Sequence, residues 1–384
     1  MHINSLGSIT KANRYSVLSF SIAAFILLSS LPKYVPRGHD SGLFVYKTVG
    51  ALILVFTLLI IGVRKKISGF STLTLFGYSV FCLFSTFWSI NPIYSLASSI
   101  SFICCLLVLY DNAVEYVDRN CSTNILYVLT ALILYVASFK ALIDYGIGPG
   151  RFVGNISPNH FAGTLIAAFG LVYLFSQSKA LIIFSWVLSV GVSLHLESRG
   201  SLVQLVFIVI VYWASTGKNL KVFCTTLFFA SLACVIVIIN SEYILLNVLD
   251  ILDKDRGISS GGTGRLNSIF EASKYIQKSP LIGYGYESVD MGVVPNSHNF
   301  FFNVTLELGF FGLIIVGMFI GSLLWQTLPH VSKNAKFFSF SLGMLIQVLF
   351  EVHLFNYGYP LSLVGILSTF CLLCCVRYQK RCDL

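Results

Sequence analysis

The chain has 384 residues, of which 56% are hydrophobic and only 11% are charged. Soluble domains carry about 25% charged residues, so this composition excludes an ordinary soluble protein. The formal net charge of +9 does not indicate a nucleic-acid partner, because lysine and arginine gather in the cytoplasmic loops of membrane proteins. We therefore expect an all-α polytopic membrane protein, in which residues 1–384 form a single membrane-embedded domain.

Apolar runs recur along the whole chain, and a helix needs about 20 such residues to cross a bilayer. The first run has no small-residue cleavage site behind it, so we interpret it as a retained helix and not as a signal peptide. The sequence predicts about 12 transmembrane helices. They lie near residues 15–32, 43–63, 70–90, 93–111, 123–143, 160–177, 179–196, 199–215, 220–240, 299–325, 336–356 and 358–376.

The orientation follows from the basic residues between these helices. They fall on one side of the predicted bundle, which is therefore cytoplasmic and holds both termini. The segment 111–120 is expected to be a loop on that side, but it is acidic and fits the rule poorly. The basic residues are Lys11, Arg14, Arg64, Lys65, Lys66, Lys218, Lys221, Lys333, Lys336, Arg377, Lys380 and Arg381.

The outer face is predicted to carry short turns and one long periplasmic loop, residues 241–297. Loops of this length are commonly functional. A short amphipathic helix is expected at 265–278, where it would lie along the membrane surface and end at Ser279-Pro280. Its apolar face is formed by Leu266, Ile269, Phe270, Ser273 and Ile276, at helical spacing.

The chain has ten cysteines, and most of them lie in or beside apolar runs. Cys371 and Cys374 have the spacing of a redox or metal pair. They fall inside a predicted membrane helix without partner ligands, so we interpret them as small apolar packing residues.

Two arginines are predicted to begin helices at the outer face. Ser198 is a good N-cap for the helix that starts at Arg199. Arg265 follows the glycine-rich stretch that ends at Gly264, and glycine lets a backbone approach a phosphate closely. Helix N-termini with guanidinium groups favour anions. The alternatives are an arginine that snorkels to the interface and a flexible glycine hinge.

His298 lies directly before the predicted helix at 299–325. Histidine has an unperturbed pKa near 6.5, so it can accept a proton at neutral pH. The alternative is a histidine that caps or packs at the interface. The seven histidines have no metal-ligand spacing, so no metal site or cofactor is predicted.

Three acidic features have competing explanations. Asp253-Lys254-Asp255 resembles the DxD motif that holds a metal and a nucleotide sugar, but no alternating strand and helix pattern surrounds it. Glu307 and Glu351 lie inside predicted helices and should face the bundle interior. We interpret Glu351 as structural, whereas Glu307 fits either a structural role or a proton relay.

Several of these residues together resemble a known family. His298-Asn299, nine residues and then Gly309-Phe310-Phe311-Gly312 resemble the HN-x9-GxxG signature of bacterial O-antigen ligases. The stretch 263–265 and the stretch 279–286 resemble the region upstream of this signature in the broader ligase and polymerase family. Arg199 matches the family's arginine at the outer end of a middle helix. Arg151 with Asn155 and Ser157-Pro158-Asn159 resembles its Arg-then-NPN stretch, with Ser157 replacing an asparagine.

The resemblance implies a C-type glycosyltransferase-like fold in the bacterial inner membrane, with a periplasmic active site and no metal or cofactor. The implied reaction moves polysaccharide from undecaprenyl diphosphate to the lipid A-core acceptor in lipopolysaccharide biosynthesis. Arg199 and Arg265 would contact the carrier diphosphate, and His298 would act on the acceptor. Arg151, Asn299 and Gly264 would complete the substrate-binding set. An inverting reaction is expected, because the acceptor attacks opposite the leaving diphosphate.

Other functions remain open. A polymerase would use a second carrier-linked glycan as acceptor, and a protein O-glycan transferase is a further member of the same family. A transporter of lipid-linked sugars would show inverted repeats and helices broken near the midplane, and we find neither signal in the sequence. The candidate charges instead cluster at the outer interface.

Overall fold

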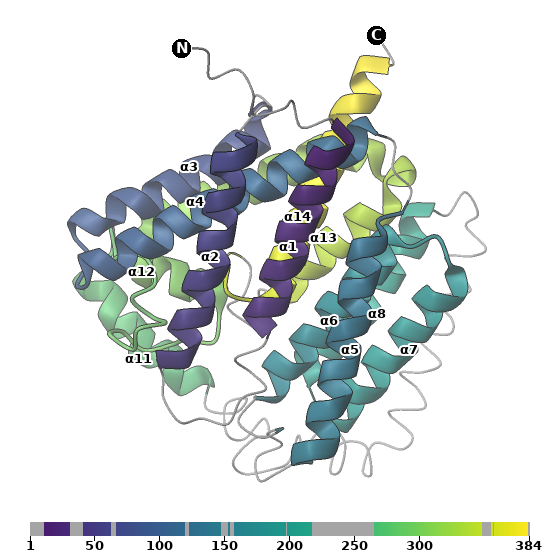
Figure 1. Cartoon of the computed structure of the whole chain (residues 1–384). Helices are drawn as coiled ribbons and strands as arrows, with labels where there is room; N and C mark the ends of the chain where they lie inside the picture. The colour runs from purple at the N-terminus through teal and green to yellow at the C-terminus, as the bar shows by residue number, and fades with distance from the viewer. Residues whose placement is uncertain are drawn as a thin grey trace, which may run out of the picture.

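In the computed structural model the chain forms a bundle of helices (Figure 1). The structure describes residues 11–30, 41–62, 67–119, 123–146, 153, 157–196, 198–216, 265–347, 355 and 357–382. The helices in chain order are α1 (Lys11–Ser30), α2 (Ser41–Ile61), α3 (Phe70–Phe84), η2 (Ser85–Phe87), α4 (Pro92–Asp118), α5 (Ile125–Tyr145), α6 (Pro158–Phe175), α7 (Lys179–His195), α8 (Arg199–Thr216), α11 (Arg265–Lys278), α12 (Phe300–Thr327), η6 (Leu328–Lys333), α13 (Ala335–Gln347) and α14 (Pro360–Cys382).

Each predicted membrane helix has a helix at its place except the one at 220–240, which lies outside the described residues. Six helices of the described part are long and apolar enough to cross a membrane. They are Phe70–Phe87, Pro92–Asp118, Ile125–Tyr145, Pro158–Phe175, Phe300–Lys333 and Pro360–Lys380. Four shorter apolar helices accompany them, so an all-helical fold with several membrane spans is confirmed, whereas the number of twelve stays a prediction.

The helices α6 and α14 form the centre of the bundle. In each of them 83% of the apolar window is buried, as expected for helices that are hydrophobic on every side. The helix α14 packs against α4, α13, α6 and α12, and α6 also packs against α5 and α7. Cys371 and Cys374 on α14 are buried and form no disulfide, as expected for small packing residues.

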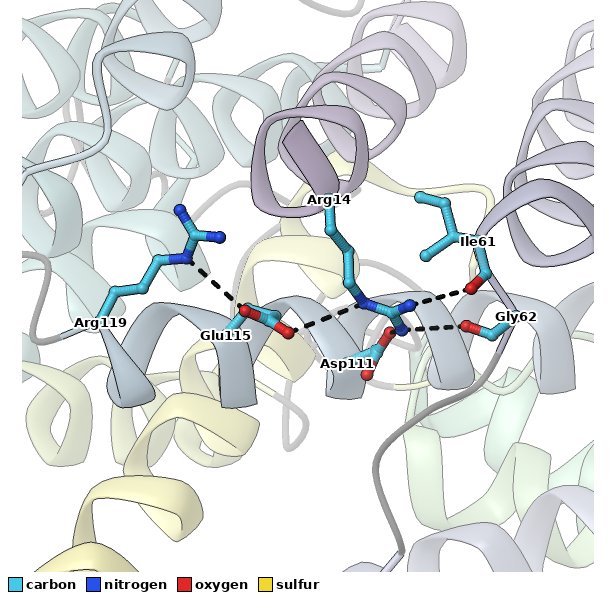
Figure 2. A network of polar contacts seen from close by, with 6 residues as sticks. All are labelled: Arg14, Ile61, Gly62, Asp111, Glu115 and Arg119. Carbon is cyan, nitrogen blue, oxygen red and sulfur yellow. Dashed lines mark hydrogen bonds and ion pairs between the residues drawn. The ribbon is translucent and has the colours of Figure 1, made fainter. Parts of the chain in front are cut away.

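A buried ion network joins α1, α2 and α4 near the end of the bundle at which the C-terminus is marked (Figures 1 and 2). Arg14 on α1 pairs with Asp111 on α4 and lies 3.7 Å from a carboxylate oxygen of Glu115. It also donates hydrogen bonds of 2.9 Å to the carbonyls of Ile61 and Gly62 at the end of α2. The three charged side chains are at most 7% exposed. A buried charge is costly unless it is paired, so each of these charges is stabilised by the other members of the network.

The prediction that the acidic segment 111–120 is a loop was wrong for most of its length. The helix α4 continues to Asp118, and Glu115 also pairs with Arg119 at 3.5 Å, one turn further on (Figure 2). Asp111 and Glu115 are therefore internal partners of arginines and not solvent-facing loop charges. This pairing explains why the segment fitted the positive-inside rule poorly.

Other basic residues assigned to the cytoplasmic side lie at the same end of the bundle. Arg377 near the end of α14 donates to the hydroxyls of Ser68 and Tyr110, at 3.2 and 3.3 Å. Lys336 at the start of α13 donates to the Ser176 carbonyl just beyond the end of α6, at 3.2 Å. The sequence thus grouped these helix ends correctly, while the identity of the membrane side remains a prediction.

We expect Arg14→Ala to lower the free energy of unfolding by about 3–5 kcal/mol, because it leaves buried carboxylates without their partner. Thermal or denaturant unfolding of the purified protein measures this change. Lys140→Ala is the matched control, since its ion pair with Asp144 on α5 is exposed. Equal and small losses in both variants would contradict a structural role for the Arg14 network.

Candidate functional site

His298 lies in a strained turn immediately before α12. Its φ is 54°, and it is one of two non-glycine residues with positive φ in the described part of the chain, the other being Glu287. This left-handed conformation costs a residue other than glycine about 1–2 kcal/mol of free energy. Such residues cluster at functional sites, where the surrounding structure holds them in place. The His298 side chain is exposed at the end of the bundle opposite Arg14.

Hydrogen bonds around Asn303 hold this turn. The buried amide of Asn303 accepts from the backbone N–H and the hydroxyl of Ser297, at 3.0 and 2.6 Å. It also donates to the side-chain oxygen of Asn296 at 3.2 Å, and that oxygen accepts from the His298 N–H at 2.8 Å. The side-chain oxygen of Asn299 caps α12 by accepting from the first-turn N–H groups of Phe301 and Phe302. Both neighbours of His298 are therefore fixed.

The helix α12 is broken at Gly309, where φ is 65° and ψ is −167°. The expectation that no membrane helix is broken was therefore wrong for α12. In an unbroken helix the N–H groups of Phe310 and Phe311 would donate to the carbonyls of Leu306 and Glu307. The segment 279–286 takes the place of both bonds. The carbonyls of Pro280 and Leu281 accept from Phe310 and Phe311, and the N–H groups of Tyr284 and Gly285 donate to Leu306 and Glu307, all at 2.8–3.3 Å.

The 279–286 segment is also paired on its other side, with the turn between α3 and α4. The Trp88 indole donates to the Ile282 carbonyl at 2.8 Å, and the Tyr286 N–H donates to the Ser85 hydroxyl at 2.9 Å. The Ser95 hydroxyl donates to the Tyr286 carbonyl at 2.8 Å. Backbone polar groups away from water need such partners, so the segment is built into the bundle as a structural element.

Two glycines make this packing compatible with the chain. A Cβ at Gly309 would overlap the backbone of Leu281 and Ile282, and its φ is in the left-handed region. A Cβ at Gly283 would overlap the backbone of Leu306 and Glu307. The first of these glycines belongs to the HN-x9-GxxG signature, and the second belongs to the stretch upstream of it.

A small cavity of about 40 Å³ lies beside the first turns of α12. Its polar lining comes from Tyr78, Tyr286, Glu287, Asp290, Asn303 and Glu307. A carboxylate oxygen of Glu307 accepts from the Val289 N–H at 3.3 Å. This bond ties the loop after the 279–286 segment to α12, which favours a structural role for Glu307 over a proton relay.

The starts of α6, α8 and α14 are joined at the same end as His298. The Ser198 hydroxyl before α8 donates to the side-chain oxygen of Asn159 on α6 at 3.0 Å. His160 on α6 shares a 3.0 Å hydrogen bond with the Tyr359 hydroxyl before α14. Phe355, just upstream, packs against Phe300 at the start of α12, with 5.4 Å between ring centroids. Helix N-termini carry partial positive charge, so this end favours an anion.

The predicted arginines begin the helices that the sequence assigned to them. The helix α8 starts at Arg199 with Ser198 before it, and α11 starts at Arg265 and covers the predicted range 265–278. The side chains of Arg199 and Arg265 lie outside the described residues, as do Arg151, Gly264 and the Asp253-Lys254-Asp255 stretch. Their approach to His298 therefore stays a prediction.

The helix α11 buries only part of the apolar face that the sequence predicted, since Ile276 packs against α12 and its neighbours but Phe270 does not. Ala272 is fully buried in a small cluster with Val289, Val294 and Leu306, whereas Phe270 on the predicted apolar face is 65% exposed. The helix therefore turns a face centred near Ala272 towards α12. Phe270 is the more hydrophobic residue, so the sequence pattern predicts its burial. Close packing of α11 against α12 instead requires a small side chain at the contact, and Ala272 provides it.

The sequence did not predict Asn303 as a site residue, nor the pairing at Gly309. Asn303 is one turn after Asn299, a spacing that places both on one helix face and was the available signal. No local pattern announces the pairing of 279–286 with α12, because it depends on contacts between distant segments.

Part of the chain matches a family of known proteins. Residues 184–317 match the family model described as O-antigen ligase, which confirms the resemblance seen in the sequence. No curated protein matches the chain. The matched range contains the starts of α8, α11 and α12, His298 and the Gly309 break. The family indicates a glycosyl-transferring membrane enzyme of the ligase and polymerase type, with lipid-linked glycans as substrates.

We expect Gly309→Ala to lower the free energy of unfolding by at least about 1–2 kcal/mol, because alanine is strained at positive φ and would meet the Leu281 backbone. Gly317→Ala, further along α12, is the matched control, since a Cβ there has open space around it. Unfolding of the two purified variants provides the measurement. A Gly309→Ala protein as stable as the Gly317→Ala protein would rule out the close pairing described above.

Proposed function

We propose that the protein is an O-antigen ligase. It transfers polysaccharide from undecaprenyl diphosphate to the lipid A-core acceptor at the periplasmic face of the bacterial inner membrane. The observation that carries the proposal is the strained, exposed His298 in a fixed turn, inside the range that matches the O-antigen ligase family. Lipopolysaccharide biosynthesis is the process in which this transfer occurs.

The donor is proposed to bind through its diphosphate. Arg199 and Arg265 are the first residues of α8 and α11, where unpaired helix N–H groups favour an anion. A guanidinium group forms bidentate contacts with phosphate oxygens and keeps its charge at any physiological pH. Both arginines would therefore stabilise the charge that develops on the leaving diphosphate. Arg151 and Gly264 are proposed to complete this contact.

The acceptor hydroxyl is proposed to bind at His298. One ring nitrogen takes the proton while the hydroxyl oxygen attacks the anomeric carbon, and the bond from that carbon to the diphosphate oxygen breaks. The reaction inverts the anomeric centre, because attack is opposite the leaving group. Asn299 is proposed to contact substrate in addition to its capping role. This scheme assigns the neutralising charge to guanidinium groups, and the proposal includes no metal or cofactor.

The related alternative is a polymerase, in which the acceptor is a second carrier-linked glycan. The same arginines and the same base serve both reactions, so the acceptor alone distinguishes them. We favour the ligase because the HN-x9-GxxG signature resembles the ligases in particular.

The test is a transfer assay with purified protein, carrier-linked glycan and lipid A-core. We expect wild type to glycosylate the core, and His298→Ala to slow this by about 10²–10⁴-fold through loss of the base. Arg199→Ala and Arg265→Ala should each slow it by about 10²–10³-fold.

Lys274→Ala on the exposed face of α11 is the control and should transfer glycan like wild type. Lengthened carrier-linked chains with a bare core would identify a polymerase. Full activity of the His298→Ala protein would overturn the proposed base.

A second prediction concerns Asn303 as a positioning residue. Asn303→Leu removes the three hydrogen bonds that the Asn303 side chain makes to the turn, so we expect about a 10²-fold loss in turnover through misplacement of His298. Asn303→Asp keeps the acceptor for Ser297 and should recover part of that loss. Ser322→Ala on α12 is the control, because that hydroxyl bonds only to the Phe319 carbonyl in its own helix. Unchanged turnover and KM in Asn303→Leu would refute the role.

A further inference from the structure

A second and larger cavity lies at the end of the bundle opposite His298. Its volume is about 560 Å³, and it is enclosed by the ends of α4, α8 and α14 and the start of α13. Sites for small molecules occupy roughly 300–1,000 Å³, so a ligand the size of a lipid headgroup fits this volume. The cavity is separate from the proposed transfer site and plays no part in that reaction.

The charge of the lining is positive. Lys333 and Lys336 both line the cavity, and its described lining residues include no aspartate or glutamate. The Lys336 ammonium group is held in place, because it donates to the Ser176 carbonyl at 3.2 Å and lies 5.9 Å from the centre of the Tyr173 ring. A fixed ammonium group loses less freedom when it binds an anion than a mobile one does.

The start of α13 adds further donors. Ala335, Lys336 and Phe337 line the cavity, and as the first three residues of a helix they have N–H groups without partners inside that helix. The first intrahelical bond is made by the next residue, which donates to the Asn334 carbonyl at 3.0 Å. The Asn334 side chain is bonded to Gln379 on α14, at 3.2 and 3.3 Å, which fixes the distance between the two helices.

The remaining wall is aromatic. Tyr116, Tyr212 and Tyr378 line the cavity from three different helices, and Tyr378 is 53% exposed. Tyrosines of this kind are enriched where helices leave the hydrocarbon and enter the headgroup layer. A cavity lined by positive groups and by aromatic rings matches a phosphate group that is attached to apolar chains.

We propose that this cavity binds the phosphate group of an anionic phospholipid headgroup. Lys333, Lys336 and the first N–H groups of α13 are its donors, and the tyrosines contact the glycerol and the upper part of the chains. Basic pockets between membrane helices on the cytoplasmic side recognise such headgroups. The bound lipid would join α4, α8, α13 and α14 at the end where the Arg14 network joins α1, α2 and α4.

The test is lipid retention by the full-length protein in detergent, measured by native mass spectrometry with phosphatidylglycerol or phosphatidylcholine added. We expect wild type to retain phosphatidylglycerol preferentially. Each lysine near an anionic headgroup contributes about fivefold in affinity, so the double variant Lys333→Gln with Lys336→Gln should bind about 25-fold more weakly. Lys274→Gln with Lys278→Gln on α11 is the charge-matched control and should bind like wild type.

A second variant separates the cavity from general surface charge. Thr216→Trp fills the mouth of the cavity at the end of α8 without changing its charge, and it should reduce retention as well. Equal retention of phosphatidylglycerol by wild type and the double lysine variant overturns the proposal, and so does equal retention of the two lipids. Release of the lipid by millimolar inorganic phosphate would assign the site to free phosphate instead.

Discussion

The main-chain pairing at Gly309 is the constraint on which the rest of the proposed site depends. A helix that spans a membrane cannot leave its N–H and carbonyl groups unpaired, because lipid offers them no hydrogen bonds. The break in α12 frees two N–H groups and two carbonyls, and the 279–286 segment pairs with all four. The broken helix and the segment must therefore form together. The loop that leads to His298 begins directly after this pairing, so the pairing fixes where that loop starts.

This coupling gives the HN-x9-GxxG signature a physical meaning. Gly309 lies ten positions after Asn299, which corresponds to about 15 Å along a helix. Asn299 caps the start of α12 next to His298. Ten positions later, Gly309 has no side chain and so lets the backbone of Leu281 pack against the helix. Asn303 and Glu307 lie between these two residues. Each accepts a hydrogen bond from the loop that leads to His298. The signature thus marks the two ends of the first part of α12. This stretch of helix connects the His298 turn to the break at Gly309.

The features that the sequence predicted correctly depend on interactions between residues that are close in the sequence. Apolar runs predicted most helices, and the periodicity at 265–278 gave the bounds of α11, because both signals are local. Asp111 was wrongly placed in a loop, since its charge suggested solvent and its partner Arg14 is far away in the sequence. The pairing of 279–286 with α12 and the buried face around Ala272 depend on contacts between distant segments in the same way. Residue types suggested His298 as a base, whereas only the structure gave its strained φ and the asparagine that fixes it.

The two ends of the bundle solve the problem of charge in different ways. In the Arg14 network, arginine and carboxylates are neutralised within the protein, so α1, α2 and α4 are joined there without a ligand. At the end with His298, the starts of α6, α8, α12 and α14 present partial positive charge in the same direction, and arginine is the first residue of α8 and α11. Hydrogen bonds between neutral groups hold the turn around His298 there. Such bonds keep their geometry when a charged substrate arrives and leaves, whereas an ion pair with the arginines proposed to bind that substrate would not.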